Sequence, residues 1–353
     1  MRSLHVVSSD ARRGAETFAV DLADGLRAAG HEAAVVALRA SDRAATHPVR
    51  VLGRSRRSLT TLGALRPAAA SVDVVVAHGS STLEACAVAL AGSGIPFVYR
   101  TIGDPSYWVT APWRRRAIAA MLRRAARNVV LWPGAAAEVT RLYGFPRGRV
   151  DVIPNAVPKE RFPRKDDEYR ARARRRLELP ERATCLGIVG ALSHEKQVAA
   201  AIRALRSMPE THLVVAGDGP ERPFLERLAL DVAPGRVKFL GSVEDPRDVY
   251  AAADLLVLPS RSEGMPAVII EAGLVGTATV ASGVGAIPEM VDDDITGFLI
   301  PTASPGALAT RVQEALPRAR EVGMQARATF LSRYTIDDVV PAWTTTLEKV
   351  RRR

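Results

Sequence analysis

The sequence has few cysteines, few aromatic residues and no long hydrophobic run, and each shortage argues against a class of protein. Its 353 residues include two cysteines, Cys86 and Cys185, without metal-like spacing, which argues against a zinc site or a disulfide scaffold. Aromatic residues make up 5% of the chain, and no nucleic-acid-binding motif is recognisable, so no nucleic acid is expected as a partner. No apolar run reaches the ~18 residues that span a bilayer, and the apolar start is too short for a signal peptide. We expect a soluble, cytoplasmic protein with buried, reduced thiols.

The charge is strongly basic, with a formal net charge of +11. Of the 49 basic residues 44 are arginine, a skew that GC-rich coding alone can produce. Part of the excess lies in residues 113–127, which read as a basic amphipathic helix. Such a helix can lie on anionic lipid, which would place the protein at the inner face of a membrane. The alternative is a solvated helix whose Ile118, Met121 and Leu122 face the core.

Length and periodicity predict two α/β domains. Apolar residues make up 47% of the chain, enough for two hydrophobic cores, and 353 residues exceed one typical domain. Short apolar runs alternate with Ala-rich helical stretches, which favours parallel sheets covered on both faces. In the first half these expected strands are residues 4–7, 33–38, 72–77, 96–99 and 129–132. Ligands of such sheets bind beyond the carboxyl ends of the strands.

Two glutamates flank the predicted start of a helix in the second half. Residues 254–260 read as a buried strand that ends at a turn, and Pro266 suits the first position of a helix. The amides of residues 267–269 would then point out of the helix start, a ready-made site for an anion such as a diphosphate. Glu263 precedes that start and Glu271 lies a little over one turn inside. The alternative is a surface loop and an ordinary helix with two solvated acids.

This spacing resembles the E-x7-E signature of the family 4 retaining glycosyltransferases, which have the GT-B fold. Further motifs resemble that family in order along the chain: residues 14–16 with 21–26, 152–157 followed by Phe162, 188–192 with Glu195-Lys196, 213–220, 237–241, and 280–282 with 297–300. The resemblance implies two doubly wound Rossmann-like domains facing a central cleft. We therefore expect an acceptor-binding domain at 1–157, a linker at 158–180, a nucleotide-sugar-binding domain at 181–333, and a helix at 334–353 that crosses back to the first domain.

The resemblance also implies a reaction and assigns residues to it. A sugar would pass from a nucleotide diphosphate, UDP or GDP, to a hydroxyl of a glycan, a lipid-linked or a small-molecule acceptor, with retained anomeric configuration and with the leaving phosphate helping to take the acceptor proton. Neither a cofactor nor a metal is implied. Glu263 would hold sugar hydroxyls and Glu271 ribose hydroxyls, while Lys196 and the amides of Ala267 and Val268 would stabilise the departing diphosphate. The remaining donor-site positions are Gly14, Gly190, Gly217, Gly241, Gly264 and Met265.

The chain departs from the family pattern in two places. The family commonly has an arginine in the phosphate loop, where this chain has Ala191 and Ser193, so the cation would come from Lys196 alone or from Arg12 or Arg13. Many members present a histidine where this chain has Ile102. Asp104 is the candidate to replace it as an acceptor-side base. His78 is a second candidate, with a purely structural histidine as its alternative.

Two other functions fit the same residues. A nucleotide-sugar 2-epimerase shares this fold and donor site, and a non-catalytic sugar-nucleotide-binding module would explain both departures. A retaining hydrolase needs two carboxyl groups ~5 Å apart, which an eight-residue spacing across a loop and a helix does not ensure. We therefore expect the transferase.

Overall fold

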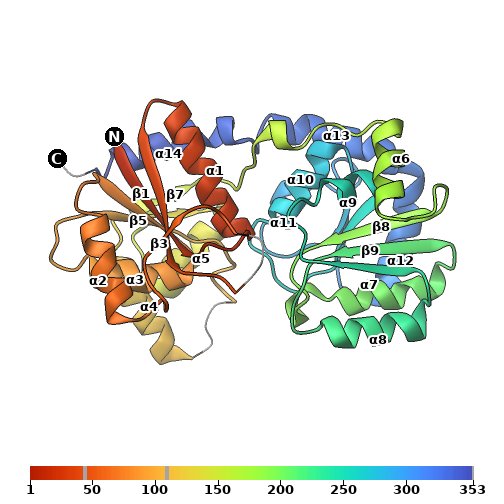
Figure 1. Cartoon of the computed structure of the whole chain (residues 1–353), viewed down its shortest axis with the longest axis horizontal. Coiled ribbons are helices and arrows are strands. Elements are labelled where there is room, and N and C mark those ends of the chain that lie inside the picture. The colour runs from red at the N-terminus through yellow and green to blue at the C-terminus, as the bar shows by residue number, and fades with distance from the viewer. Residues whose placement is uncertain (43–45, 108–110, 352–353) are drawn as a thin grey trace. The chain divides into compact units, whose positions relative to one another are not determined.

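A computed structural model describes residues 1–42, 46–107 and 111–351 of the chain. The chain forms two compact units (Figure 1). One comprises Met1–Val157 together with Ile336–Arg353, and the other Pro158–Thr335. Each unit is built on one parallel sheet, and we describe the two separately.

The first unit contains a seven-stranded sheet in the order β3-β2-β1-β4-β5-β6-β7. Its strands are β1 (Arg2–Ser9), β2 (Glu32–Arg39), β3 (Arg50–Val51), β4 (Val74–His78), β5 (Phe97–Arg100), β6 (Arg127–Val130) and β7 (Val150–Val152). All five strands expected from apolar runs are confirmed. Two further strands, β3 and β7, were not predicted, because both are short and neither is buried, so no apolar run marks them.

Helices cover both faces of this sheet. They are α1 (Gly14–Ala28), α2 (Leu59–Ala68), α3 (Ser80–Ala89), α4 (Pro112–Arg124), α5 (Pro133–Tyr143) and α14 (Ile336–Glu348). α1 and α14 pack together on one face, and α2, α3 and α4 follow one another on the other (Figure 1). The core between the sheet and the first pair includes Phe18, Leu22 and the fully buried Trp343. The last helix of the chain is therefore part of the first unit.

The second unit repeats the same topology with six strands, in the order β10-β9-β8-β11-β12-β13. Its strands are β8 (Thr184–Val189), β9 (Thr211–Ala216), β10 (Val237–Gly241), β11 (Leu255–Leu258), β12 (Thr279–Ser282) and β13 (Phe298–Ile300). Its helices are α6 (Asp167–Arg176), α7 (Val198–Ala204), α8 (Arg222–Val232), α9 (Arg247–Ala252), α10 (Ala267–Val275), α11 (Ile287–Met290), α12 (Pro305–Ala315) and α13 (Ala319–Leu331). α7, α8 and α12 form one layer, and α6, α9, α10 and α13 form the other (Figure 1).

The segment 158–180 is not the free linker that its charge run suggested. It carries α6, and Arg174 within that helix is completely buried. The guanidinium of Arg174 donates to Asp254 Oδ2 at 2.9 Å and to the carbonyl of Ala252 at 3.0 Å. Lys165 Nζ donates to Ala253 O at 2.8 Å and to Thr277 Oγ1 at 2.7 Å. Buried cations that satisfy backbone carbonyls bind this segment tightly to the second unit, which is a role that charge alone does not reveal.

Both cysteines are buried and unpaired, as expected. Burial raises the pKa of the Cys185 thiol to about 12 and that of Cys86 still further, so neither thiol is reactive. In the described part of the chain, no helix has the length and apolar character needed to cross a membrane.

Candidate active site

The donor-site motifs meet at the switch point of the second sheet. The strand order reverses between β8 and β11, and ligands of open parallel sheets bind beyond the strand ends at such a point. The turn after β8 carries Gly190 and leads to Lys196, while the turn after β11 carries Glu263 and leads into α10. Residues 67 positions apart in the chain are thereby brought together.

Glu263 is the centre of this arrangement. The residue is 8% exposed, and its Oε1 accepts hydrogen bonds from Lys196 Nζ and Ser260 Oγ, each at 2.6 Å. The Lys196 side chain remains 26% exposed, so its ammonium lies where an anionic ligand can reach it. A buried carboxylate needs such partners, because an uncompensated charge in a protein interior costs several kcal/mol. Two residues that were predicted separately for the donor site, Glu263 and Lys196, are thus hydrogen-bonded to each other, and their roles stay predictions.

The helix after Glu263 starts one residue later than expected. Pro266 is the N-cap of α10, and Ala267 is its first residue. The amide of Ile269 donates to the carbonyl of Pro266 at 3.2 Å, so it is not one of the free donors that the sequence suggested. The amides of Ala267 and Val268 belong to the first turn, where a helix supplies no backbone acceptor. These two amides and the positive end of the helix dipole form an anion-binding terminus.

Gly285, in the loop after β12, fixes the turn that holds Glu263. Its φ is +58°, and a Cβ there would lie 1.9 Å from the carbonyl oxygen of Glu263. The next residue, Ala286, donates its amide to the carbonyl of Gly264 at 2.9 Å. Glycine is required because any side chain would displace the Glu263 backbone. Met265, two residues after Glu263, is buried, with 6% of its surface exposed.

Glu271 is oriented by a tyrosine that sequence reasoning missed. Tyr250 in α9 donates its hydroxyl to Glu271 Oε2 at 2.5 Å. Burial, reinforced by the adjacent Glu271 carboxylate, raises the pKa of Tyr250 well above its ordinary value. The phenol therefore stays protonated and remains a hydrogen-bond donor to the carboxylate. Tyr250 lies on the buried face of a short helix, so nothing in the local sequence marks it as functional.

The predicted donor-site glycines lie at the ends of three adjacent strands. Gly190, Gly217 and Gly241 follow or end β8, β9 and β10, and all three have positive φ. A Cβ on Gly217 would lie 1.7 Å from the carbonyl oxygen of Gly190, so this pair is required for close packing of the two turns. Whether the glycines also contact a donor stays a prediction.

An arginine outside the phosphate loop lies beside Lys196. Ala191 and Ser193 leave that loop without a guanidinium, but Arg261 in the Glu263 turn bonds to the loop's other end. Its amide donates to the carbonyl of Glu195 at 2.8 Å, and its Nη1 lies 3.0 Å from His194 Nε2. The exposed Arg261 is thus a second cation near the start of α10.

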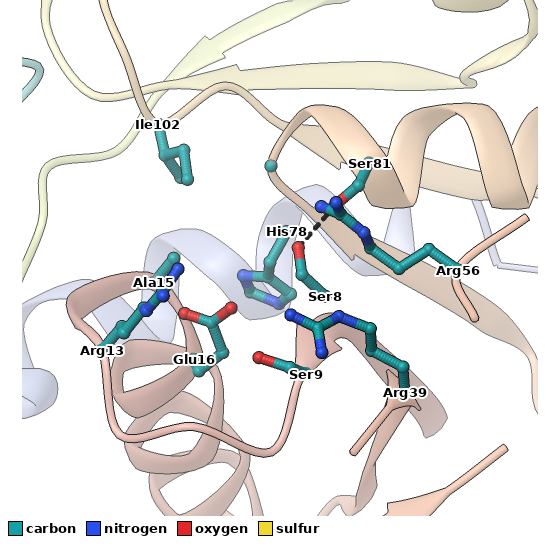
Figure 2. Close-up of a pocket in the computed structure, with 11 residues that line it drawn as sticks. Ser8, Ser9, Arg13, Ala15, Glu16, Arg39, Arg56, His78, Ser81 and Ile102 are labelled. Atoms are coloured by element: carbon teal, nitrogen blue, oxygen red, sulfur yellow. Dashed lines mark hydrogen bonds between the residues drawn. The ribbon is translucent and has the colours of Figure 1, made fainter. Parts of the chain in front are cut away.

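A separate pocket of about 310 Å³ lies at the switch point of the first sheet. It is lined by the ends of β1, β2 and β4 and by residues after them: Ser8, Ser9, Arg13, Ala15, Glu16, Arg39, Arg56, His78, Gly79, Ser81 and Ile102 (Figure 2). Figure 2 shows His78 in the middle of the group, with Arg13 and Glu16 on one side and Arg39 and Arg56 on the other. Ser8 Oγ and Ser81 Oγ lie 2.5 Å apart and join β1 to α3.

His78 is a pocket residue and a structural one at the same time. It is 1% exposed, and its Nε2 lies 3.1 Å from Nδ1 of the buried His5. Burial, with a contribution from the Arg27 charge, lowers the pKa of His5 to about 3. Burial also lowers the pKa of His78 well below its usual value, with smaller contributions from His5 and Arg100. Both rings are therefore neutral at pH 7. His78 Nδ1 has no hydrogen-bond partner in the described part of the chain.

The other candidates on the acceptor side differ in their surroundings. Asp104 Oδ1 accepts from the amide of Ser106 at 2.8 Å and from its hydroxyl at 2.6 Å, and Asp104 does not line the pocket. Its catalytic role stays a prediction. Gly14 is the first residue of α1, between two pocket residues, and a Cβ there would meet nothing within 4 Å. Arg12 donates to Thr46 O at 3.2 Å, whereas Arg13 lines the pocket.

Sequence reasoning missed most of this pocket. Ser8, Arg39, Arg56 and Ser81 come from four separate segments with no shared motif. The available signal was topological, because Ser8 and Arg39 lie at the carboxyl ends of expected strands. Glu16 was noted as part of a motif, without a role. Burial raises its pKa.

Each half of the chain matches a known family of glycosyltransferases. Residues 12–161 match the model described as Glycosyltransferase Family 4, and residues 183–317 match the model described as Glycosyl transferases group 1. A similar curated protein is the D-inositol 3-phosphate glycosyltransferase of Salinispora tropica, 35% identical over 198 residues, which are 51% of this chain and 41% of that protein. The chain thus spans less than half the length of this relative.

Solved structures agree in fold. The structure of Anabaena HepE in complex with UDP-glucose superimposes with a TM-score of 0.88 over 99% of this chain and 100% of that one, at 22% identity. Sucrose-phosphate synthase from Thermosynechococcus elongatus gives 0.84 over 99% of each chain, at 21% identity. Two Rossmann-like units with the predicted motifs in the predicted order therefore confirm the fold class. The chain belongs to the group 1 glycosyltransferases, with the GT-B fold of family 4.

Proposed function

We propose that this protein transfers a sugar from a nucleotide-diphosphate sugar to a hydroxyl acceptor, with retention of anomeric configuration and without a metal ion. The observation that carries the proposal is the Lys196–Glu263 pair beside the amino end of α10. A cation, a helix terminus and a buried carboxylate within one turn suit a ligand that combines a diphosphate with hydroxyls. A similar solved protein, Anabaena HepE, was crystallised with UDP-glucose, which supports a donor of this class.

In this proposal each group acts where charge or hydroxyls lie in the donor. The diphosphate would bind at the amides of Ala267 and Val268 and between Lys196 and Arg261. As the bond to the sugar breaks, negative charge grows on the leaving phosphate, and preoriented donors stabilise that charge more than the ground state. Two side-chain cations and two amides would stabilise the charge on the leaving phosphate, as a metal ion does in metal-dependent enzymes.

The two glutamates would hold the neutral parts of the donor. Glu263 Oε1 is already shared by Lys196 and Ser260, which leaves Oε2 to accept from sugar hydroxyls. Glu271, held by Tyr250 through Oε2, would accept from the ribose hydroxyls. The front-face mechanism, in which the leaving phosphate takes the acceptor proton, is part of the proposal and requires no protein base in this unit.

Turnover with a donor panel tests the proposal. The protein would be incubated with UDP-, GDP-, ADP- and dTDP-sugars and a panel of hydroxyl acceptors, with and without EDTA, and the anomeric configuration of the product read by NMR. We expect an α-linked product from an α-linked donor, and we expect EDTA to leave the rate unchanged. In Glu263→Gln, kcat/KM should fall at least about 100-fold. Glu289→Gln, an exposed glutamate of the same unit, is the matched control. Inverted product or full activity in Glu263→Gln would contradict the proposal.

We also propose that α4 contacts an anionic membrane surface. Its apolar side is used inside the first unit, since Leu122 is fully buried and Ile118 and Met121 are half-buried. What remains outside is basic, with Trp113 65% exposed among exposed arginines. Cosedimentation with anionic vesicles, lost in Arg123→Gln/Arg124→Gln and in high salt, is the expected result. Equal sedimentation with neutral vesicles would contradict it.

A further inference from the structure

Resting on the proposed transfer reaction, we propose that the pocket of the first unit binds the acceptor and that this acceptor carries a phosphate monoester. Three arginines, Arg13, Arg39 and Arg56, line a pocket of about 310 Å³, together with the buried His78. The acceptor would place its phosphate among the guanidiniums and its reacting hydroxyl near the imidazole.

The arginines are available to a ligand. Arg56 forms no ion pair with a carboxylate among residues 1–42, 46–107 and 111–351. Arg13 forms none within 4.0 Å in the same residues, but its charge acts on the buried Glu16 carboxyl, which also lines the pocket. Arg39 donates to the carbonyl of Ala40 at 2.8 Å, and its nearest carboxylate, Asp42 at 3.7 Å, is 99% exposed. Exposed pairs of this kind are weak, so the charges of Arg39 and Arg56 are not neutralised within the unit, whereas Glu16 offsets part of the charge of Arg13. The neighbouring Arg57, which does not line the pocket, is paired with Glu84 at 2.9 Å.

This concentration of charge suits a dianion. A phosphate monoester carries close to two negative charges at pH 7 and three acceptor oxygens, and a guanidinium fork binds such oxygens in pairs. A single carboxylate would leave two of the three arginines without a partner. The volume is at the small end of ligand sites, which fits one phosphorylated sugar or polyol unit rather than a polymer.

The floor of the pocket is suited to a hydroxyl. Ser3 Oγ donates to Glu32 O at 3.5 Å and lies 3.3 Å from His5 Nε2, so we assign the proton on His5 to Nε2. His5 Nδ1 then accepts from His78 Nε2 at 3.1 Å. This leaves a lone pair on His78 Nδ1, the atom without a partner. A neutral imidazole nitrogen in that state accepts a hydrogen bond from an alcohol.

The phosphate could belong to a soluble metabolite or to a lipid headgroup, and the test separates these sources. Acceptors are compared in pairs that differ only in the phosphate: glucose 6-phosphate with glucose, inositol 1-phosphate with inositol, and glycerol 3-phosphate with glycerol. A second arm offers vesicles of phosphatidylcholine with and without phosphatidylinositol phosphate. Each arm is run on the wild type, on Arg39→Gln/Arg56→Gln, and on Arg57→Gln as the matched control.

We expect at least one phosphorylated acceptor to be used with a KM at least about tenfold below that of its dephosphorylated partner. The preference should be lost in Arg39→Gln/Arg56→Gln and kept in Arg57→Gln. Use of the soluble compounds identifies a metabolite, and use of the vesicles alone identifies a headgroup. No preference in either arm, or a preference that survives the double substitution, would overturn the inference.

The same variants separate this inference from the proposed reaction. Donor binding is measured by calorimetry with the nucleotide sugar alone and should be equal in all three proteins. Calorimetry with glucose 6-phosphate or inorganic phosphate tests the pocket without turnover, and the double variant should weaken that binding about tenfold or more. If no donor binds but the phosphate compound does, the proposed reaction fails and the anion site stands. If the donor binds and the phosphate compound does not, the anion site fails alone.

Discussion

The two units share one sheet topology, yet their switch points are built in different ways. In the second unit the backbone shapes most of the site, through turns at Gly190, Gly217 and Gly285 and through the start of α10. In the first unit the site consists of side chains from separate segments, with three arginines around His78. The shared sheet topology therefore determines where a ligand binds, while the residues around each switch point determine which ligand binds.

The largest effect is expected from a substitution in the turn that holds Glu263 in the second unit. Gly285→Ala would place a Cβ 1.9 Å from the carbonyl oxygen of Glu263 at a φ of +58°. We expect the unfolding free energy of the second unit to fall by about 4 kcal/mol, because strain and a backbone clash add. Urea unfolding followed by circular dichroism measures this. Gly306→Ala, where a Cβ meets nothing within 4 Å, is the control, and equal stability of the two variants would contradict the account.

The second prediction concerns the first unit and its buried histidines. The folded-state pKa of His5 is about 3 and that of His78 is also lowered, so below pH 6.5 the unfolded chain binds more protons than the folded one. Stability must then fall as the pH falls, by about 2 kcal/mol for His5 between pH 7 and pH 5, and His78 acts in the same direction. The raised pKa of Glu16 acts in the opposite direction and offsets part of this loss.

Tryptophan fluorescence isolates this effect, because the second unit, Pro158–Thr335, contains no tryptophan. Urea unfolding at pH 7 and pH 5 gives the difference for the wild type. His5→Gln removes one of the two groups and should reduce that difference by about 2 kcal/mol. A wild-type stability that does not change between the two pH values would show that the histidines are not buried as described.

A third prediction tests how Glu271 is positioned. Tyr250→Phe removes the hydroxyl that donates to Glu271 Oε2 while keeping the ring in the core. We expect the donor Kd to rise about tenfold, equivalent to about 1.4 kcal/mol, with kcat changed little. Calorimetry and steady-state kinetics measure the two quantities. An unchanged Kd would mean that Glu271 needs no orientation from Tyr250.

The smallest expected effect concerns the exposed cation. Arg261→Gln should weaken binding of the nucleoside diphosphate about three- to fivefold, because an exposed charge contributes less than about 1 kcal/mol. The loss should shrink at high salt. Arg227→Gln on the exposed side of α8 is the control. If the two variants bind equally, Arg261 does not replace the missing phosphate-loop arginine.

The sequence predicted the second unit better than the first for a physical reason. Glycine turns, a strand end and a helix start constrain consecutive residues, so Glu263, Lys196 and Glu271 are visible as motifs. Tyr250 was missed because its contact with Glu271 comes from helix packing, and Gly285 because it acts on a turn 22 positions away. The arginine pocket was missed because no local pattern joins Arg13, Arg39 and Arg56.

The error at 158–180 has a similar cause. A run of charged residues is usually solvated, but Arg174 and Lys165 are buried and hydrogen-bond to carbonyl groups. Nothing in the local sequence distinguishes such a buried cation from a surface one. The parallel sheets covered by helices on both faces, by contrast, followed from the strand–helix alternation.

Calorimetric titration of nucleotide sugars into the wild type, Glu271→Ala and Arg56→Gln shows whether the donor binds at the site in the second unit. We expect one donor to bind the wild type and Arg56→Gln equally and to bind Glu271→Ala at least about tenfold more weakly. That result would assign the donor to the second unit and leave the arginine pocket to another ligand. A donor that binds all three proteins equally, or none that binds the wild type, would contradict it.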